Sequence, residues 1–75
     1  MPLLNVKIIE GVFTPKQKQD MIQKLTDTMV SIEGENLRPY TWVVLEEVKS
    51  EDWGIGGKSV STANVKTLAA SNPKG

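Results

Sequence analysis

The 75-residue chain contains no cysteine and no histidine. Without cysteine no disulfide can form, and without either residue type the usual zinc ligand sets are missing. A domain of this size buries only about 60% of the surface that its unfolded chain exposes. Such a domain needs a staple, which can be a disulfide, a metal or a partner subunit. We therefore expect the chain to be stabilised by forming an oligomer.

An excess of charge of either sign is also missing. Nine lysine and arginine residues balance nine acidic residues, and no basic stripe with interleaved aromatic side chains is present, which argues against a nucleic-acid partner. No apolar stretch approaches the roughly 18 residues of a membrane span, and residues 1–10 lack the basic start and apolar core of a signal peptide. We expect a cytoplasmic protein with no membrane partner.

Three segments carry clear secondary-structure patterns. Residues 3–9 alternate between apolar and polar side chains, which predicts a strand. Residues 15–32 repeat apolar side chains at helical spacing, after the capping residue Thr14 and before the natural stop Gly34. Residues 41–48 predict a second strand, whose apolar run suits a strand covered on both faces. One helix cannot cover both faces, which again indicates a partner subunit.

The order strand, helix, strand within 48 residues predicts one β-α-β unit with parallel strands. Residues 35–39 are predicted to be a connector, in which Pro39 biases Arg38 away from helical conformation. A glycine-rich bend at 53–57 precedes a short hairpin arm at 58–61. The predicted class is therefore α/β (α+β).

Residues 1–61 are expected to form one domain. Residues 62–75 are expected to form a C-terminal arm or tail that is partly disordered, with its last several residues frayed.

Pro2 is the first candidate for chemistry. If Met1 is removed, Pro2 carries the only free backbone amine of the chain. The ordinary pKa of an α-amino group lies near 8, and burial or a nearby cation lowers it because both disfavour the charged form. An amine with a pKa near neutrality can act as a general base. Proline at position two is common, however, and alone usually has no function.

The other candidates each have a plain structural alternative. Arg38, the only arginine, is either a solvated surface charge or a carboxylate-binding group. Trp42 lies on an apolar strand, where tryptophan more often packs in a core, and Trp53 lies beside the glycine bend, where it can wall a pocket. The bend matches neither the dinucleotide-binding fingerprint nor a P-loop. One acidic cluster lacks calcium-loop spacing, so we expect no metal there; it comprises Glu46, Glu47, Glu51 and Asp52.

Taken together, several segments resemble the 4-oxalocrotonate tautomerase family. The resemblance runs from Pro2 to about Ser61 and rests on the ordered combination of short motifs. These are Met1-Pro2 before a strand, Glu10-Gly11, Thr14-Pro15-Lys16-Gln17, the strand Thr41–Val48, and Trp53-Gly54-Ile55-Gly56-Gly57. The resemblance implies a β-α-β fold with a C-terminal hairpin. Two chains would form a four-stranded sheet with two helices, and three such dimers a homohexamer.

The resemblance also implies a function. The amino-terminal proline of this family moves a proton between the oxygen and carbon ends of an enol–ketone pair. The substrates are usually small 2-keto or 2-hydroxy-dienoate acids, with no cofactor or metal, and we expect a role in the catabolism of aromatic compounds. Pro2 matches the catalytic proline, and Trp53 matches an aromatic residue before the glycine bend.

The chain departs from the family at two substrate-binding arginines. Val12 and Trp42 stand at those positions. Arg38, four residues before Trp42, is the remaining candidate for carboxylate binding, and Lys7 and Lys58 are weaker ones. Loss of one donor to a developing oxyanion typically slows a reaction by about 100- to 1,000-fold. A less charged or more aromatic substrate would suit the two tryptophans.

Three hypotheses follow. The first is a cofactor-independent tautomerase with Pro2 as general base, or a related proline-based dehalogenase, hydratase or decarboxylase. The second is a non-catalytic or partner-dependent subunit of a mixed oligomer, which the residues Val12 and Trp42 motivate. The third is an unrelated small β-α-β interaction module.

Overall fold

The computed structural model describes residues 2–70, which divide into two compact units. The first unit comprises residues 2–7 and 13–46, and the second comprises residues 8–12 and 47–70. Within the described residues, no helix is long and apolar enough to cross a membrane.

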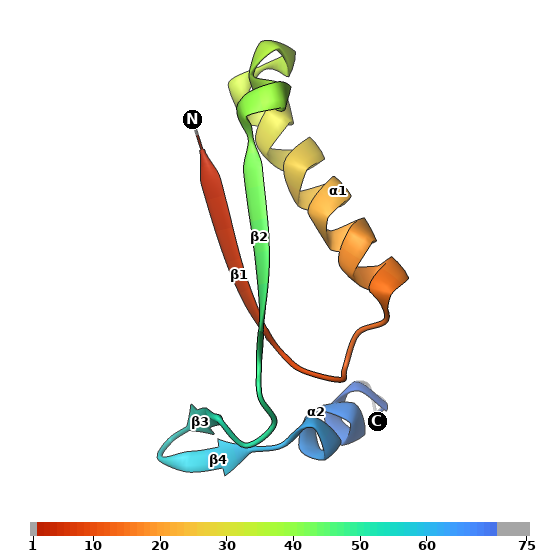
Figure 1. Ribbon diagram of the computed structural model, residues 1–75, viewed down its shortest axis with the longest axis vertical. Coiled ribbons are helices and arrows are strands. Elements are labelled where there is room, and N and C mark those ends of the chain that lie inside the picture. The colour runs from red at the N-terminus through yellow and green to blue at the C-terminus, as the bar shows by residue number, and fades with distance from the viewer. Residues whose placement is uncertain (1, 71–75) are drawn as a thin grey trace. The chain divides into compact units, whose positions relative to one another are not determined.

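Two strands, β1 (Leu3–Ile9) and β2 (Trp42–Val48), form a two-stranded sheet (Figure 1). At one end the Trp42 N–H donates to the Pro2 carbonyl at 3.1 Å, and at the other the Glu10 N–H donates to the Val48 carbonyl at 2.8 Å. Both partners advance in the same direction along the chain, so the strands are parallel. The predicted β-α-β unit is confirmed, although β2 begins one residue later than predicted.

The helix between these strands, α1 (Pro15–Glu33), begins with a capping box. The Gln17 N–H donates to Thr14 Oγ1 at 3.1 Å, and the Thr14 N–H donates to Gln17 Oε1 at 2.9 Å. These two bonds satisfy donors that the first helical turn would otherwise leave unpaired. Gly34, with φ of 105°, ends the helix as predicted, in a conformation that side chains rarely adopt.

The connector after α1 differs from its prediction. Residues 35–40 form a 3₁₀ helix, η1 (Glu35–Tyr40), and Pro39 lies inside it. Proline has no backbone N–H to donate. Pro39 fits in this turn because the two bonds at its borders are donated by the Leu37 and Thr41 N–H groups, each at 3.2 Å from its acceptor. In a 3₁₀ helix residues three apart align, which lets Glu35 and Arg38 pair.

The second unit holds the predicted hairpin. Strands β3 (Trp53–Ile55) and β4 (Lys58–Val60) pair antiparallel, with Ile55 opposite Lys58. The two-residue turn is Gly56-Gly57, with φ of 60° and 82°. Positive φ at both central residues is the requirement of a type I′ turn, whose twist matches that of the paired strands.

A second helix, α2 (Thr62–Ala70), follows the hairpin and was not predicted. Its start has the two reciprocal bonds of a capping box, with asparagine in place of glutamate. The Asn64 N–H donates to Ser61 Oγ at 3.1 Å, and the Ser61 N–H donates to Asn64 Oδ1 at 3.0 Å. Residues 62–70 of the expected tail are therefore helical, and residues 71–75 lie outside the described residues. The domain boundary at residue 61 stays a prediction.

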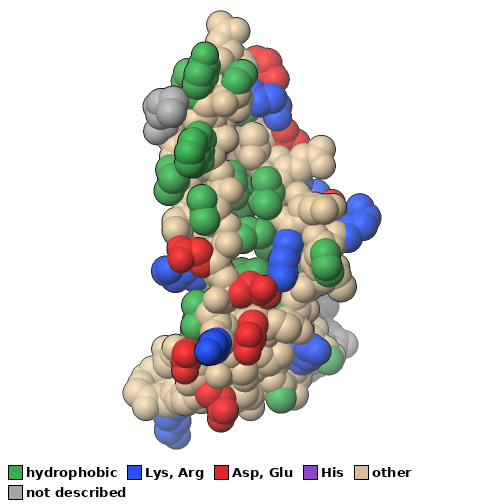
Figure 2. Space-filling model, in the orientation of Figure 1, with side chains coloured by type: hydrophobic (Ala, Val, Ile, Leu, Met, Phe, Trp, Pro, Cys, Tyr) green, Lys and Arg blue, Asp and Glu red, His purple; other side chains and the backbone are tan. Residues whose placement is uncertain are grey.

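Burial is sparse throughout. Among the described residues, the buried hydrophobic side chains are only those of Ile8, Ile9 and Val30. Several large apolar side chains are exposed, and Figure 2 shows hydrophobic side chains grouped over β1, β2 and η1 in the upper part of the view. The exposed large hydrophobic residues are Leu3, Ile22, Ile32, Leu37, Tyr40, Trp42, Ile55 and Leu68. This distribution agrees with the shortage of core expected from chain length.

The turn after β1 is fixed to the start of α2 by polar bonds. Thr62 Oγ1 donates to the Glu10 carbonyl at 2.5 Å, and the Thr62 N–H donates to Ser50 Oγ at 2.9 Å. The Ser50 N–H in turn donates to Glu10 Oε1 at 3.2 Å. Gly11 stands inside this cluster with φ of 79°, where an added Cβ would lie 3.1 Å from Thr62 Cγ2.

The substitution Gly11→Ala is expected to lower the free energy of unfolding by about 1–2 kcal/mol, because a side chain disfavours the left-handed conformation. The contact with Thr62 adds to this cost. Chemical denaturation at one fixed protein concentration measures the change. Adding Thr62→Ser, which keeps the hydroxyl and removes the methyl, should recover the steric part.

Gly54→Ala is the matched control, because a Cβ there meets only the Lys58 carbonyl oxygen at 3.9 Å. Equal stability of the Gly11→Ala and Gly54→Ala proteins would contradict the role assigned to Gly11.

Candidate functional site

Pro2 lies directly before β1 and is half-buried. Its carbonyl accepts the Trp42 N–H at 3.1 Å, so the first described residue is already part of the parallel pairing. The proline ring also fixes φ, which removes one degree of freedom from the residue. Pro2 is thus attached to the sheet through its carbonyl group.

Trp42 is the first residue of β2, and its side chain is 57% exposed. The alternative that Trp42 is a core residue is therefore wrong for this chain taken alone. Leu3, which follows Pro2, is exposed to a similar degree at 58%. Pro2 therefore stands beside two exposed apolar residues, one its neighbour in sequence and one its neighbour in the sheet.

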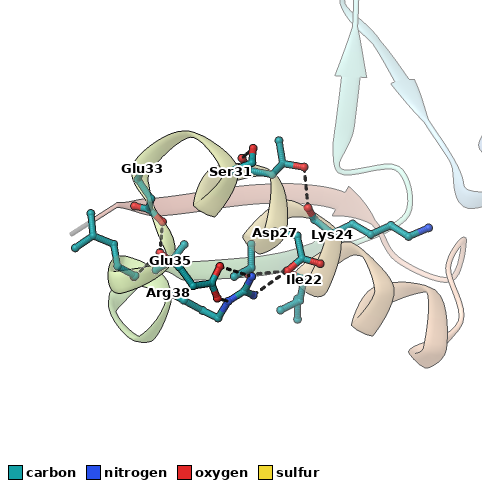
Figure 3. A network of polar contacts seen from close by, with 11 residues as sticks. Ile22, Lys24, Asp27, Ser31, Glu33, Glu35 and Arg38 are labelled. Atoms are coloured by element: carbon teal, nitrogen blue, oxygen red, sulfur yellow. Dashed lines mark hydrogen bonds and ion pairs between the residues drawn. The ribbon is translucent and has the colours of Figure 1, made fainter.

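Arg38 lies in η1, between two carboxylates (Figure 3). Its Nε donates to Glu35 Oε1 at 2.6 Å, its Nη1 donates to Asp27 Oδ1 at 2.8 Å, and its Nη2 lies 3.4 Å from Glu35 Oε2. The hydrogen bond from Arg38 lowers the pKa of Glu35, and the bonds to Glu35 and Asp27 raise the pKa of Arg38. Glu35 and Arg38 therefore both carry their charges at neutral pH.

Val12 and Trp53, the remaining predicted site residues, belong to the second unit, and both are half-buried. Val12 follows Gly11 in the turn held by Thr62. Trp53 opens β3 opposite Val60. The structure thus brings Pro2 and Trp42 together through a hydrogen bond, places Arg38 in the same unit, and gives Val12 and Trp53 well-defined local surroundings of their own.

A polar cluster on the sheet was not predicted. Glu46 Oε1 on β2 accepts hydrogen bonds from Asn5 Nδ2 at 2.7 Å and from Lys7 Nζ at 3.1 Å, both on β1. The bond from Asn5, followed by that from Lys7, lowers the pKa of Glu46. Lys7, a weaker candidate for carboxylate binding, is therefore already paired. Only the register between strands shows this, because Asn5 and Glu46 are 41 residues apart.

No metal site is assembled in the described part of the chain. No group of three or more acidic side chains there could hold an ion. In the acidic segment 46–52, Glu46 is turned to Asn5 and Lys7, and Glu51 has a φ of 74° in the turn before β3. Lys58, the other weaker candidate cation, begins β4 and is exposed.

The chain matches a known protein family over most of its length. Residues 2–63 fit the family model described as tautomerase enzyme. A probable tautomerase, K2, of Dickeya dadantii is 38% identical over 61 residues, which cover 81% of this chain and 90% of the relative. A probable tautomerase of Helicobacter pylori is 37% identical over 62 residues, covering 80% of this chain and 90% of the relative.

Solved structures give the same similarity. A crystal structure of apo unfused 4-OT superimposes with a TM-score of 0.70 at 30% identity, covering 79% of this chain and 93% of that one. A crystal structure of DmpI from Helicobacter pylori superimposes with a TM-score of 0.69 at 36% identity, covering 79% and 95%. The residues that fit the family model include the two-stranded parallel sheet, α1 and the hairpin.

Replacing Glu46 by glutamine is expected to change the pH dependence of stability. The pKa of Glu46 is lower in the folded chain than its ordinary value of 4.5. Its pairing therefore stabilises the fold above pH 4.5, and the stabilisation disappears as pH falls through the lowered pKa. Denaturation curves from pH 7 to pH 3 should show a wild-type advantage that shrinks below pH 4.5.

The bond from Asn5 is the largest cause of the lowered pKa of Glu46. In the Asn5→Ala background, proteins with Glu46 and with Glu46→Gln should therefore differ much less in the pH dependence of their stability. A difference that persists unchanged down to pH 3 would contradict this assignment. The absolute effect is expected to be small, since exposed pairs are screened by solvent.

Proposed function

The chain belongs to the tautomerase enzyme family, and on this premise we propose that the Pro2 amine, freed by removal of Met1, is the general base of an enol–keto isomerisation. The observation that supports the proposal is the place of Pro2. Its carbonyl is bonded to the Trp42 N–H at the start of the parallel sheet, within the residues that match the family. Family membership supports an isomerase of this type, and the base and its substrate are our proposal.

The proposed reaction is a proton transfer without a change of oxidation state. The amine nitrogen of Pro2 takes the proton of the enol hydroxyl, and the O–H electron pair forms the C=O bond. The electrons of the C=C bond then take a proton from the Pro2 ammonium at carbon, which restores the amine. An amine with a pKa near the working pH serves both steps, because it accepts and returns the proton readily.

We propose a small 2-hydroxy-dienoate or 2-keto acid as substrate, and the cytoplasm as its location. A less charged or more aromatic enol fits this chain better than a dicarboxylate. Trp42, whose N–H is bonded to the Pro2 carbonyl, is exposed, and Arg38 is already bonded to Glu35 and Asp27. Lys7 is likewise paired with Glu46.

We further propose that the active form is a homo-oligomer, a hexamer built from three dimers. The three buried hydrophobic side chains in the described part of the chain are few for a stable domain of this length, and the exposed apolar residues supply surface for association. Light scattering should give a mass six times the 8.3 kDa of the chain. A monomer at micromolar concentration would contradict the oligomer and favour a small interaction module instead.

The proposed base is tested by ketonisation of phenylenolpyruvate and 2-hydroxymuconate, followed by ultraviolet absorbance. Protein whose mass shows loss of Met1 should turn over at least one enol, and Pro2→Ala should lower kcat by about 100-fold or more, since a positioned base typically contributes 10²- to 10⁴-fold. Pro15→Ala, the same change at the first turn of α1, is the matched control and should leave kcat nearly unchanged.

A second arm uses protein that retains Met1, in which the Pro2 nitrogen is an amide and should not act as a base. Full activity of the Pro2→Ala protein, or of the Met1-retaining protein, would overturn the proposed base. Lack of turnover by the mature wild type with both enols, restored by adding a second tautomerase chain, would favour the partner-dependent subunit.

A further inference from the structure

Arg38 is the only arginine of the chain, and its guanidinium is held by carboxylates from two different elements. Glu35 belongs to η1, three residues before Arg38, whereas Asp27 belongs to α1, eleven residues before it. Figure 3 shows the guanidinium of Arg38 lying between these two carboxylates. The planar fork of arginine suits such a pair of acceptors, because its donors point in fixed directions. Through these bonds Arg38 links η1 to α1.

The η1 turn leads directly to the start of β2. The Thr41 N–H donates to the Arg38 carbonyl at 3.2 Å, and Thr41 Oγ1 lies 2.8 Å from the Leu37 carbonyl oxygen. The same hydroxyl lies 2.5 Å from Glu33 Oε2 at the end of α1. The next residue, Trp42, donates its N–H to the Pro2 carbonyl. A continuous series of contacts within the first unit thus connects Arg38 with Pro2.

We propose that Arg38 is a positioning residue for Pro2 and not a ligand of the substrate. By pairing with Asp27 and Glu35 it fixes the turn that presents the Trp42 N–H to the Pro2 carbonyl. This inference rests on the proposed function of Pro2. A substrate carboxylate would have to displace two carboxylates of the same chain, which act at high effective concentration. Arg38 is the only arginine of the chain. In every other copy it has the same two carboxylate partners, so a second copy supplies no unpaired guanidinium.

The effect should appear in the orientation of Pro2 more than in global stability. Exposed ion pairs contribute little to the stability of a whole domain, and the Arg38 side chain is 43% exposed. Reaction rates depend much more steeply on orientation, since a misplacement of about 1 Å can cost on the order of 100-fold. Loosening η1 is therefore expected to lower kcat while the folded fraction stays high.

The two possible roles of Arg38 predict opposite results for its carboxylate partners. Three proteins are compared with the wild type in mature, Met1-free form. These are Arg38→Gln, the double variant Asp27→Asn/Glu35→Gln, and the triple variant that combines them. If Arg38 positions Pro2, all three should lower kcat by about 10- to 100-fold with KM nearly unchanged. The triple variant should be no worse than either parent, because the residues act as one unit.

If Arg38 instead binds the substrate carboxylate, Arg38→Gln raises KM with little change in kcat. The double variant, which releases the guanidinium from both of its partners, then retains or improves activity. Either result overturns the positioning role. Lys16→Gln is the matched control, since Lys16 is an exposed cation on α1 whose ion pair with Asp20 spans 3.7 Å within that helix.

Amide hydrogen exchange gives a readout independent of turnover. The Trp42 N–H should exchange faster in Arg38→Gln and in the double variant than in the wild type and in Lys16→Gln, because its bond to Pro2 opens more often. Unchanged protection of Trp42 overturns the proposal.

Should Pro2→Ala prove fully active, the proposed function fails, and the exchange of Trp42 still decides whether Arg38 orders this turn. Should Arg38→Gln not fold, the double variant, which keeps Arg38, decides.

Discussion

The parallel pairing of β1 with β2 is the constraint on which the arrangement of this chain depends. Parallel strands require a long crossover, and α1 with η1 supplies it. The pairing extends to Pro2, whose carbonyl accepts the Trp42 N–H, so a residue next to the chain terminus is held by a residue 40 positions later. This bond attaches Pro2 to the sheet, and the proposed role of its amine depends on that attachment.

Few of the described hydrophobic side chains are buried in a single copy of the chain. Among residues 2–70 they are Ile8, Ile9 and Val30, and polar bonds join several of the elements. Thr62, Ser50 and Glu10 fix the turn after β1, and Glu46 joins the two strands through Asn5 and Lys7. An intramolecular hydrogen bond adds only about 0.5–1.5 kcal/mol net. The exposed hydrophobic residues offer further apolar surface, part of which the proposed association of copies would bury.

Two of the candidate cations for carboxylate binding, both in the first unit, are paired with carboxylates of the same chain. Arg38 is bonded to Asp27 and Glu35, and Lys7 is bonded to Glu46. A cation bonded to a carboxylate of its own chain offers less to a charged substrate than a free one. Trp42, whose backbone N–H is bonded to the Pro2 carbonyl, is instead exposed. This combination is the basis of our proposal that the substrate is a less charged or more aromatic enol.

Local rules determined much of the fold from the sequence. The alternation in residues 3–9, the capping box of Thr14 and Gln17, and the stop at Gly34 depend only on near neighbours, and the structure confirms them. The α2 cap at Ser61 and Asn64 was equally local and was missed because asparagine replaces the usual glutamate. Pro2 was identified by its position and by resemblance. Tertiary structure alone decided the environment of Arg38, the exposure of Trp42 and the pairing of Glu46. Each of these depends on residues that the sheet and the crossover bring together.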